Sequence, residues 1–218
     1  MNNFDEMADR IRDAFDRQNK VRDEALTQSR NLTRHAARTI RAIHRNDACL
    51  AGEHLNEADQ LATALREGLS ENPDLYYSGY VQDALKEYCE AHLTVSVILG
   101  QDLPSPEDLQ VTYATYLNGL SEVVGELRRR IMDILRQGHS QEVERLLDVM
   151  DDIYAQLVTM DYPDALTYGL RRRTDIARSI IERTQADVTV SYRQQQLEKR
   201  LTSLSEQLSQ IEGTDSDD

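Results

Sequence analysis

Long runs without a helix-breaking residue dominate this chain and limit the folds open to it. The 218 residues include only nine glycines and four prolines, the two residues that disfavour a helix interior most strongly. The runs between them are rich in Ala, Leu, Glu and Arg, which form helices readily. A chain of this length can bury the core of one large domain. The sequence therefore predicts an all-α, single-domain bundle of six or seven helices without strands.

Apolar residues at helical spacing place these helices along the chain. The expected helices cover, in order, about 3–45 with a break near 18–21, 48–70 after a cap at Asn46 and Asp47, 71–99, the stretch from the loop at 100–108 to about 137, 140–160, and a last region from DYPD at 161 onward. We divide the chain into a helical domain at 1–190, a C-terminal helix at 191–212 and a disordered acidic tail at 213–218.

A short heptad seam marks the expected C-terminal helix. Its apolar residues alternate between steps of four and three, at Leu197, Leu201, Leu204, Leu208 and Ile211. The seam covers about two heptads, fewer than a coiled coil usually shows. Packing on the chain's own domain or on a neighbouring subunit explains the pattern as well as a dedicated zipper does.

The net charge of −14 excludes a protein that is basic over its whole surface. Only three of the 25 basic residues are lysines, and abundant Asp and Glu with so little Lys resembles the proteins of halophilic archaea. On that interpretation most acidic residues are solvated surface. The N-terminus lacks the basic and apolar regions of a signal peptide, and the longest apolar stretch is too short to cross a bilayer. We expect a cytoplasmic protein without a membrane partner.

An arginine face is expected on the first helical region. Arg30, Arg34, Arg38, Arg41 and Arg45 recur at steps of three and four, and residues 27–45 contain no Asp or Glu. Guanidinium groups pair with phosphates through two parallel hydrogen bonds. The pattern indicates binding to a nucleic-acid backbone, whereas a solvated face that pairs with neighbouring acidic groups is the plainer alternative.

Two glutamates interrupt the third expected helix. In GYVQDALKEYCEAH at 79–92, Glu87 lies in the middle of an apolar stripe and Glu90 borders it, at about 100° per residue. An unpaired carboxylate in such a place is costly. His92, near Glu90, is the one histidine that we consider as a proton carrier.

A second acidic pair, Glu122 and Glu126, shares a face of the fourth expected helix beside Gly119 and Gly125. A glycine in a helix interior costs about 1 kcal/mol relative to Ala, and close approach of another helix or room for a substrate would explain it. If the third and fourth helices are neighbours, four carboxylates surround one cavity. Such clusters bind Mg²⁺ or Mn²⁺, which can promote phosphodiester cleavage. Salt-bridged surface glutamates are the alternative.

Four segments together resemble the translin family, particularly archaeal relatives of translin-associated factor X. They are RDEALTQSRNLTRHAARTIRAIHR (22–45), ALKEYCEA (84–91), YLNGLSEVVGELRRRIMDILRQG (116–138) and DYPDALTYGLRRRTDIARSIIERTQADV (161–188). The resemblance implies a helical fold of about seven helices that assembles into a closed homo-oligomeric shell, usually an octamer. It also implies binding of single-stranded RNA or DNA inside that shell.

The resemblance further implies a catalytic type of subunit. Glu87 and Glu90 match the EYxEA glutamates of the metal-dependent endoribonuclease, and Glu122 and Glu126 match its acidic residues before and within GEL. All four are therefore expected as catalytic metal ligands for Mg²⁺, with Mn²⁺ as an alternative. Glu122 stands where the animal catalytic subunit has Asp, and the extra methylene can displace a ligand. Arg30, Arg34, Arg38 and Arg41 match the family's basic contribution to nucleic-acid binding.

Three hypotheses follow from the sequence. The first is a Mg²⁺-dependent endoribonuclease acting on single-stranded RNA inside an oligomeric shell. The second is a non-catalytic protein that binds single-stranded RNA or DNA, as translin does. The third is an acidic helical scaffold whose arginines pair with neighbouring subunits.

Overall fold

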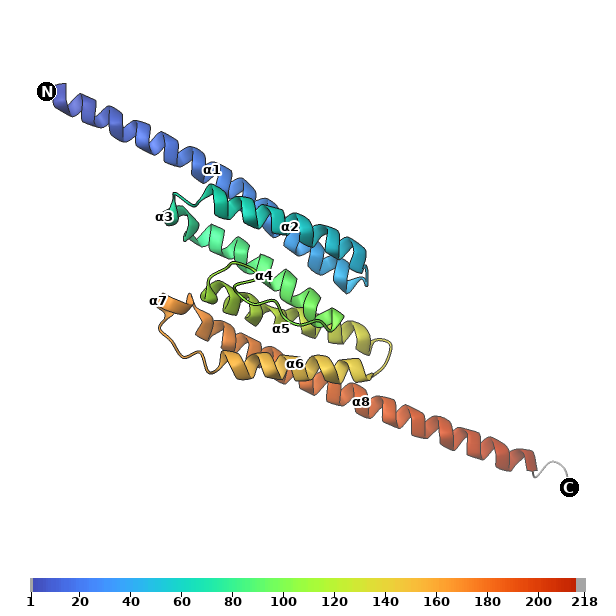
Figure 1. The fold of residues 1–218 in the computed structure, drawn as a ribbon. Coiled ribbons are helices and arrows are strands. Elements are labelled where there is room, and N and C mark those ends of the chain that lie inside the picture. Colours follow the sequence, from blue (N-terminus) through green and yellow to red (C-terminus); the bar gives the residue numbers. More distant parts are fainter. Residues whose placement is uncertain (1, 215–218) are drawn as a thin grey trace. The chain divides into compact units, whose positions relative to one another are not determined.

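The computed structural model describes the backbone of residues 2–214 and the side chains of residues 4–207. Within the described backbone every regular element is a helix, which confirms the all-α prediction (Figure 1). The helices are α1 (Asn2–His44), α2 (Ala48–Gly68), α3 (Pro73–Tyr76), α4 (Gly79–Leu99), α5 (Tyr113–Leu135), α6 (Gln141–Leu157), α7 (Asp164–Thr167) and α8 (Leu170–Thr214). Over this range six helices have 17 residues or more, and α3 and α7 have four each.

The chain divides into two compact units. The first comprises Met1–Val123 and Tyr162–Arg171, and the second comprises Val124–Asp161 and Arg172–Asp218. Helix α5 therefore contributes its first half to one unit and its second half to the other. In the part of the chain that the structure describes, no helix has the length and apolarity that a membrane span requires.

The core of the first unit lies where α1 packs against α2 and α4. Ala42 and Ile43 of α1 meet Ala51 of α2 and Val95 of α4, and all four are buried. A second cluster, formed by Ala36, Ile40 and Ala91, continues the same contact along α1. The many alanines keep these helices close together, because small side chains let helix axes approach.

Helix α1 runs without interruption through residues 18–21, so the expected break there is wrong. The first glycine of the chain is Gly52, and no residue of α1 therefore disfavours a helix strongly. An Asn19 to Asp23 side-chain hydrogen bond, one turn apart, spans the predicted break. The next helix begins as expected, because Asp47 caps α2 by accepting a hydrogen bond from the Leu50 amide at 3.0 Å.

Two expected helices are each interrupted after one turn. The stretch 73–99 forms α3 and α4 rather than one helix, because Ser78 has an extended backbone between them. Likewise α7 ends at Thr167, because the next residue, Tyr168, has a φ of 50°, and Gly169 follows with a φ of 83°. Left-handed residues of this kind terminate helices, so α8 begins anew at Leu170.

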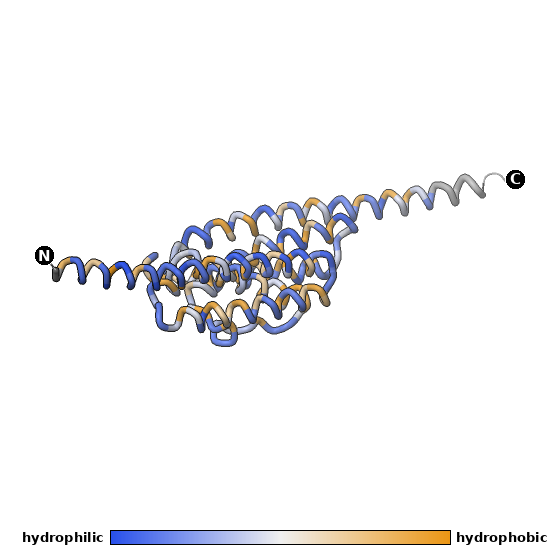
Figure 2. The backbone as a smooth tube through the Cα atoms, turned by 90° about the horizontal axis from the view of Figure 1, so that it is seen from above, coloured by the Kyte–Doolittle hydropathy of each residue, from blue (hydrophilic) through white to orange (hydrophobic). Residues whose placement is uncertain are grey.

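The second unit is built from α6, α8 and the end of α5. Val143, Leu146 and Met150 of α6 are fully buried, and α8 buries Ile181 and Val188. The expected C-terminal helix is not a separate element, because α8 continues through it to Thr214. Figure 2 shows hydrophobic positions recurring between hydrophilic ones along α1 and α8.

The heptad seam lies on the outer part of α8. Leu197, Leu201 and Leu204 are more than half exposed, so they do not pack on their own unit. The side chains of Leu208 and Ile211 lie outside the described residues. Of the expected tail at 213–218, residues 213 and 214 end α8 and the rest lies outside the described range.

Candidate metal centre

Helices α4 and α5 bring three of the four predicted metal ligands together. One carboxylate oxygen from each of Glu87, Glu90 and Glu122 lies within 4.8 Å of the others. Glu90 is buried, with 8% of its surface exposed. The side chains of Glu87 and Glu122 are 31% and 27% exposed. The cluster is thus sheltered on one side and open to solvent on the other.

Gly119 allows α5 to approach α4 closely enough to form this cluster. A Cβ added at Gly119 would lie 2.9 Å from the Cβ of Cys89 and 3.0 Å from the carbonyl oxygen of Lys86. The first distance is shorter than real Cβ atoms show and the second is tighter than most Cβ contacts, so any residue larger than glycine would force the two helices to shift. Glu122 follows Gly119 by about one helical turn, which places its carboxylate beside α4. Close helix approach explains Gly119.

The fourth predicted ligand, Glu126, is not part of this group among the described side chains. It lies one turn beyond Glu122 on α5, in the second unit. Its carboxylate is 3.6 Å from the guanidinium of Arg129. Gly125, beside it, has open space where a Cβ would stand. The role of Glu126 therefore stays a prediction.

Lys86 is a member of the cluster that the sequence analysis did not identify. Its Nζ donates hydrogen bonds to Oε1 of Glu87 at 2.9 Å and to Oε2 of Glu122 at 2.5 Å. Burial works to lower the pKa of Lys86, but hydrogen bonds and attraction from Glu122 and Glu87 outweigh burial and raise that pKa. Lys86 is therefore a charged ammonium that compensates part of the negative charge of the glutamates.

The residues present fit a divalent cation of the hard type. The three side chains offer only carboxylate oxygens, which suit Mg²⁺ and Mn²⁺. Three protein ligands leave room for the water and phosphate oxygens that Mg²⁺ usually retains. A softer metal such as Zn²⁺ usually takes sulfur or nitrogen ligands. The nearby Cys89 is fully buried, and burial raises the pKa of its thiol to about 12, which disfavours it as a thiolate ligand.

His92 belongs to a hydrogen-bond network with Asp59, and its role as a proton carrier stays a prediction. Its Nε2 lies 2.8 Å from Oδ1 of Asp59 on α2, and the hydroxyl of Tyr88 donates to the same oxygen at 2.6 Å. Burial works to raise the pKa of Asp59, but the hydrogen bonds from His92 and Tyr88 outweigh it and lower that pKa. This network links α2 to α4 beside the carboxylate cluster.

The arginine face on α1 is solvent-exposed, as its spacing requires. All five members are exposed, and they are Arg30, Arg34, Arg38, Arg41 and Arg45. No ion pair to any of them is found among the described side chains, although ion pairs are frequent elsewhere in this acidic protein. The side of α1 opposite to them carries the buried Leu32, Ala36 and Ile43. Their guanidinium groups are therefore available to a ligand.

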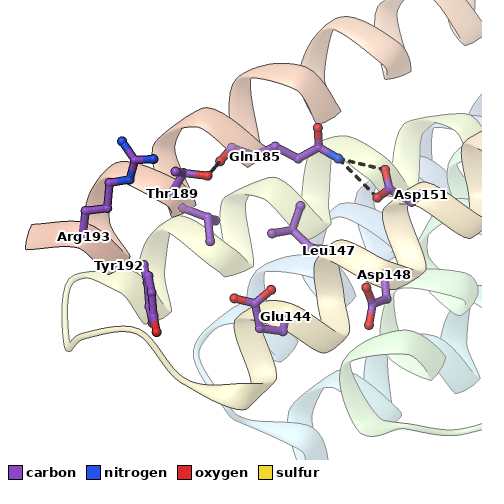
Figure 3. Close-up of a pocket in the computed structure, with 9 residues that line it drawn as sticks. Glu144, Leu147, Asp148, Asp151, Gln185, Thr189, Tyr192 and Arg193 are labelled. Carbon is purple, nitrogen blue, oxygen red and sulfur yellow. Dashed lines mark hydrogen bonds between the residues drawn. The ribbon is translucent and has the colours of Figure 1, made fainter. Parts of the chain in front are cut away.

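A groove in the second unit has a different character. It has a volume of about 360 Å³ and is lined by residues of α6 and α8 (Figure 3). Its lining includes Glu144, Asp148 and Asp151 against a single guanidinium, that of Arg193. Asp151 accepts two hydrogen bonds from Gln185 at 3.2 Å. The excess of carboxylates repels phosphate, so we assign this groove no part in binding nucleic acid.

Comparison with known proteins shows to which family the sequence is similar. Its sequence matches the Translin family model over residues 20–214. An uncharacterized protein of Methanocaldococcus jannaschii is 31% identical over 193 residues, which cover 87% of this chain and 85% of that protein.

Solved structures are similar over most of the chain. The AfC3PO–duplex RNA complex has a TM-score of 0.79 at 33% identity, and AfC3PO itself has a TM-score of 0.78 at the same identity. Both matches cover 85% of this chain and 96% of the other. The apo form of NeC3PO has a TM-score of 0.77 at 22% identity, over 84% of this chain and 96% of that one, and shares the fold.

Proposed function

This chain belongs to the translin family, and on that premise we propose that it binds RNA and cleaves single-stranded RNA with a divalent cation. The observation that carries the proposal is the cluster of Glu87, Glu90 and Glu122, whose oxygens lie within 4.8 Å of one another. Clusters of this kind suit a cation that also accepts phosphate oxygens. The relative AfC3PO, which is 33% identical, has been solved as a complex with duplex RNA.

In this proposal the three glutamates hold Mg²⁺, with Mn²⁺ as an alternative. A bound cation of this type activates water and stabilises the negative charge that develops at phosphorus. Glu87 and Glu122 are partly exposed, which leaves their carboxylates accessible to water and to an RNA phosphate. A carboxylate oxygen there can accept a hydrogen bond from the attacking water and so orient it toward the phosphate.

We further propose that Arg30, Arg34, Arg38 and Arg41 hold the RNA backbone. Their exposure and the lack of ion pairs among the described side chains support this role. Contacts to phosphates carry no direct information on base sequence, so we expect little base preference. We also propose that the chain assembles into a closed homo-oligomeric shell, as the resemblance to the family implies, with an octamer as the usual form. The exposed Leu197, Leu201 and Leu204 of α8 supply apolar surface for such contacts.

Removing divalent cations should separate binding from cleavage. A labelled single-stranded RNA incubated with the protein should be cut with Mg²⁺ or Mn²⁺ present and should stay intact after EDTA treatment. The arginines need no metal, so a mobility-shift assay in EDTA should still show the complex. Duplex RNA and single-stranded DNA of the same sequence serve as parallel substrates. Cleavage that persists in EDTA would contradict the proposal.

Neutralising the centre of the arginine face should weaken RNA binding by about tenfold or more, because each guanidinium makes charge-assisted bonds to phosphate. The test variant is Arg34→Gln with Arg38→Gln, and binding is measured by fluorescence anisotropy. The matched control is Arg10→Gln with Arg17→Gln, which removes the same charge from exposed positions of the same helix. If RNA binding is weakened equally in the two variants, it depends on the net charge of the protein and not on the arginine face.

Lys86 favours one alternative function, a non-catalytic RNA- or DNA-binding protein. Its ammonium bonds to Glu87 and Glu122, so the carboxylates have a partner without any metal. That alternative predicts binding that depends on the arginines and no cleavage with any divalent cation. High-affinity binding of short oligonucleotides would exclude the third hypothesis, an acidic helical scaffold that binds no nucleic acid.

A further inference from the structure

We propose that Lys86 is a positioning residue that acts as the resident counter-ion of the carboxylate cluster. Its ammonium holds Glu87 and Glu122 together in the metal-free protein, and it releases at least one of them when a divalent cation binds. The inference rests on the proposed metal site and names a residue of this chain that sets the affinity of that site.

Lys86 is buried and depends on its two carboxylate partners. The side chain of Lys86 is only 11% exposed, and burying an unpaired ammonium is costly. Nζ of Lys86 donates hydrogen bonds to the carboxylates of Glu87 at 2.9 Å and Glu122 at 2.5 Å, and these bonds offset that cost. Lys86 is therefore held inside by the glutamates, and loss of one partner leaves a buried charge with less compensation.

Lys86 also reduces the repulsion among the three glutamates. Three carboxylates with oxygens inside 4.8 Å repel one another in the absence of a cation. The ammonium of Lys86, placed between Glu87 and Glu122, lowers this repulsion.

The ammonium of Lys86 and a divalent cation compete for the same carboxylates. Mg²⁺ holds its oxygen ligands at about 2.0–2.1 Å, whereas Lys86 already lies within 2.9 Å of oxygens from two of the same glutamates. An ammonium and a dication that share these carboxylates are like charges at close range and repel each other. Binding of the metal therefore weakens the two hydrogen bonds of Lys86, and these hydrogen bonds in turn weaken binding of the metal.

The test compares Lys86→Met with the wild-type chain. Methionine keeps much of the length and apolar volume of lysine and removes its charge. Mn²⁺ binding is measured by calorimetry, and the midpoint of thermal unfolding, Tm, is measured in EDTA and in saturating Mn²⁺. Lys20→Met, at an exposed position of α1, removes the same charge far along the chain from the cluster and serves as the control. Lys86→Gln is the second variant should Lys86→Met not fold.

We expect Lys86→Met to bind Mn²⁺ with about tenfold lower Kd, the scale of coupling between neighbouring charges. Its Tm should fall below that of the wild type in EDTA and recover with Mn²⁺ by a larger increment than the wild type shows. A purely structural lysine would lower the Tm equally in both conditions and leave the Kd unchanged, which would overturn the inference and leave the metal site standing. Absence of Mn²⁺ binding in wild type and variant alike would overturn the metal site itself.

Discussion

Replacing Glu87 and Glu90 together by glutamine should lower metal-dependent RNA cleavage by at least about a hundredfold, the scale seen when a group that stabilises developing charge is removed. Glutamine keeps the size and polarity of glutamate but loses the charge that holds a dication. Glu122 still pairs with Lys86 in this variant, so that no buried ammonium is left alone. The rate is measured with labelled single-stranded RNA under single-turnover conditions, and RNA affinity is measured in parallel.

Affinity for RNA should change little, because the arginine face on α1 is intact. The matched control is Glu67→Gln with Glu71→Gln, two exposed glutamates near the end of α2. This control removes the same charge and should cleave at the wild-type rate. Undiminished cleavage by the Glu87→Gln, Glu90→Gln variant would show that the nuclease lies elsewhere or is a contaminant.

Helical periodicity was sufficient to predict the all-α fold, but it placed Glu87 in the middle of the apolar stripe and Glu90 at its border, whereas Glu90 is the buried one and the Glu87 side chain is 31% exposed. Capping chemistry was equally readable, since Asp47 opens α2 as expected. What periodicity cannot show is the partner across a helix contact. Glu87 looked costly in an apolar stripe because the helical pattern showed no counter-ion for it. The counter-ion is Lys86, the residue before it, which a helical wheel places about 100° away. Only packing of α4 on α5 brings Lys86, Glu87 and Glu122 together.

The interruptions of the helices were harder to predict than the helices themselves. The break before α8 depends on Tyr168 in a left-handed conformation, which a tyrosine rarely adopts. The break before α4 depends on Ser78, a residue that is common inside loops and at helix starts. Conversely, the expected break near 18–21 had no glycine or proline behind it. A backbone conformation that a residue type adopts only rarely leaves a weak signal in the sequence.

The contrast between Gly119 and Gly125 ties the fold to the candidate site. Both glycines lie inside α5 and looked equivalent in sequence. Gly119 faces the backbone of α4 at Lys86 and Glu90, whereas Gly125 has nothing within 4 Å of an added Cβ. The spacing between α4 and α5, and with it the distance from Glu122 to Glu87 and Glu90, therefore depends on Gly119 alone of the two.

Gly119→Ala should lower the free energy of unfolding by up to about 2 kcal/mol. The new methyl would meet Cys89 Cβ at 2.9 Å and Lys86 O at 3.0 Å, and neither atom is the flexible end of a side chain. Overpacking of this kind costs about 1–3 kcal/mol, and the better helix propensity of alanine offsets about 1 kcal/mol of it. Urea unfolding monitored by circular dichroism measures the loss.

Gly125→Ala is the matched control, and its free energy of unfolding should rise by about 0.4–1 kcal/mol, because alanine reduces the freedom of the unfolded chain and meets no neighbour. The two variants thus change stability in opposite directions with the same added methyl group. Gly119→Ala should also weaken Mn²⁺ binding, since α5 must move away from α4 and carry Glu122 with it, while Gly125→Ala should leave that affinity unchanged. Equal stability changes in the two variants would mean that α4 and α5 are not in the close contact on which the carboxylate cluster depends.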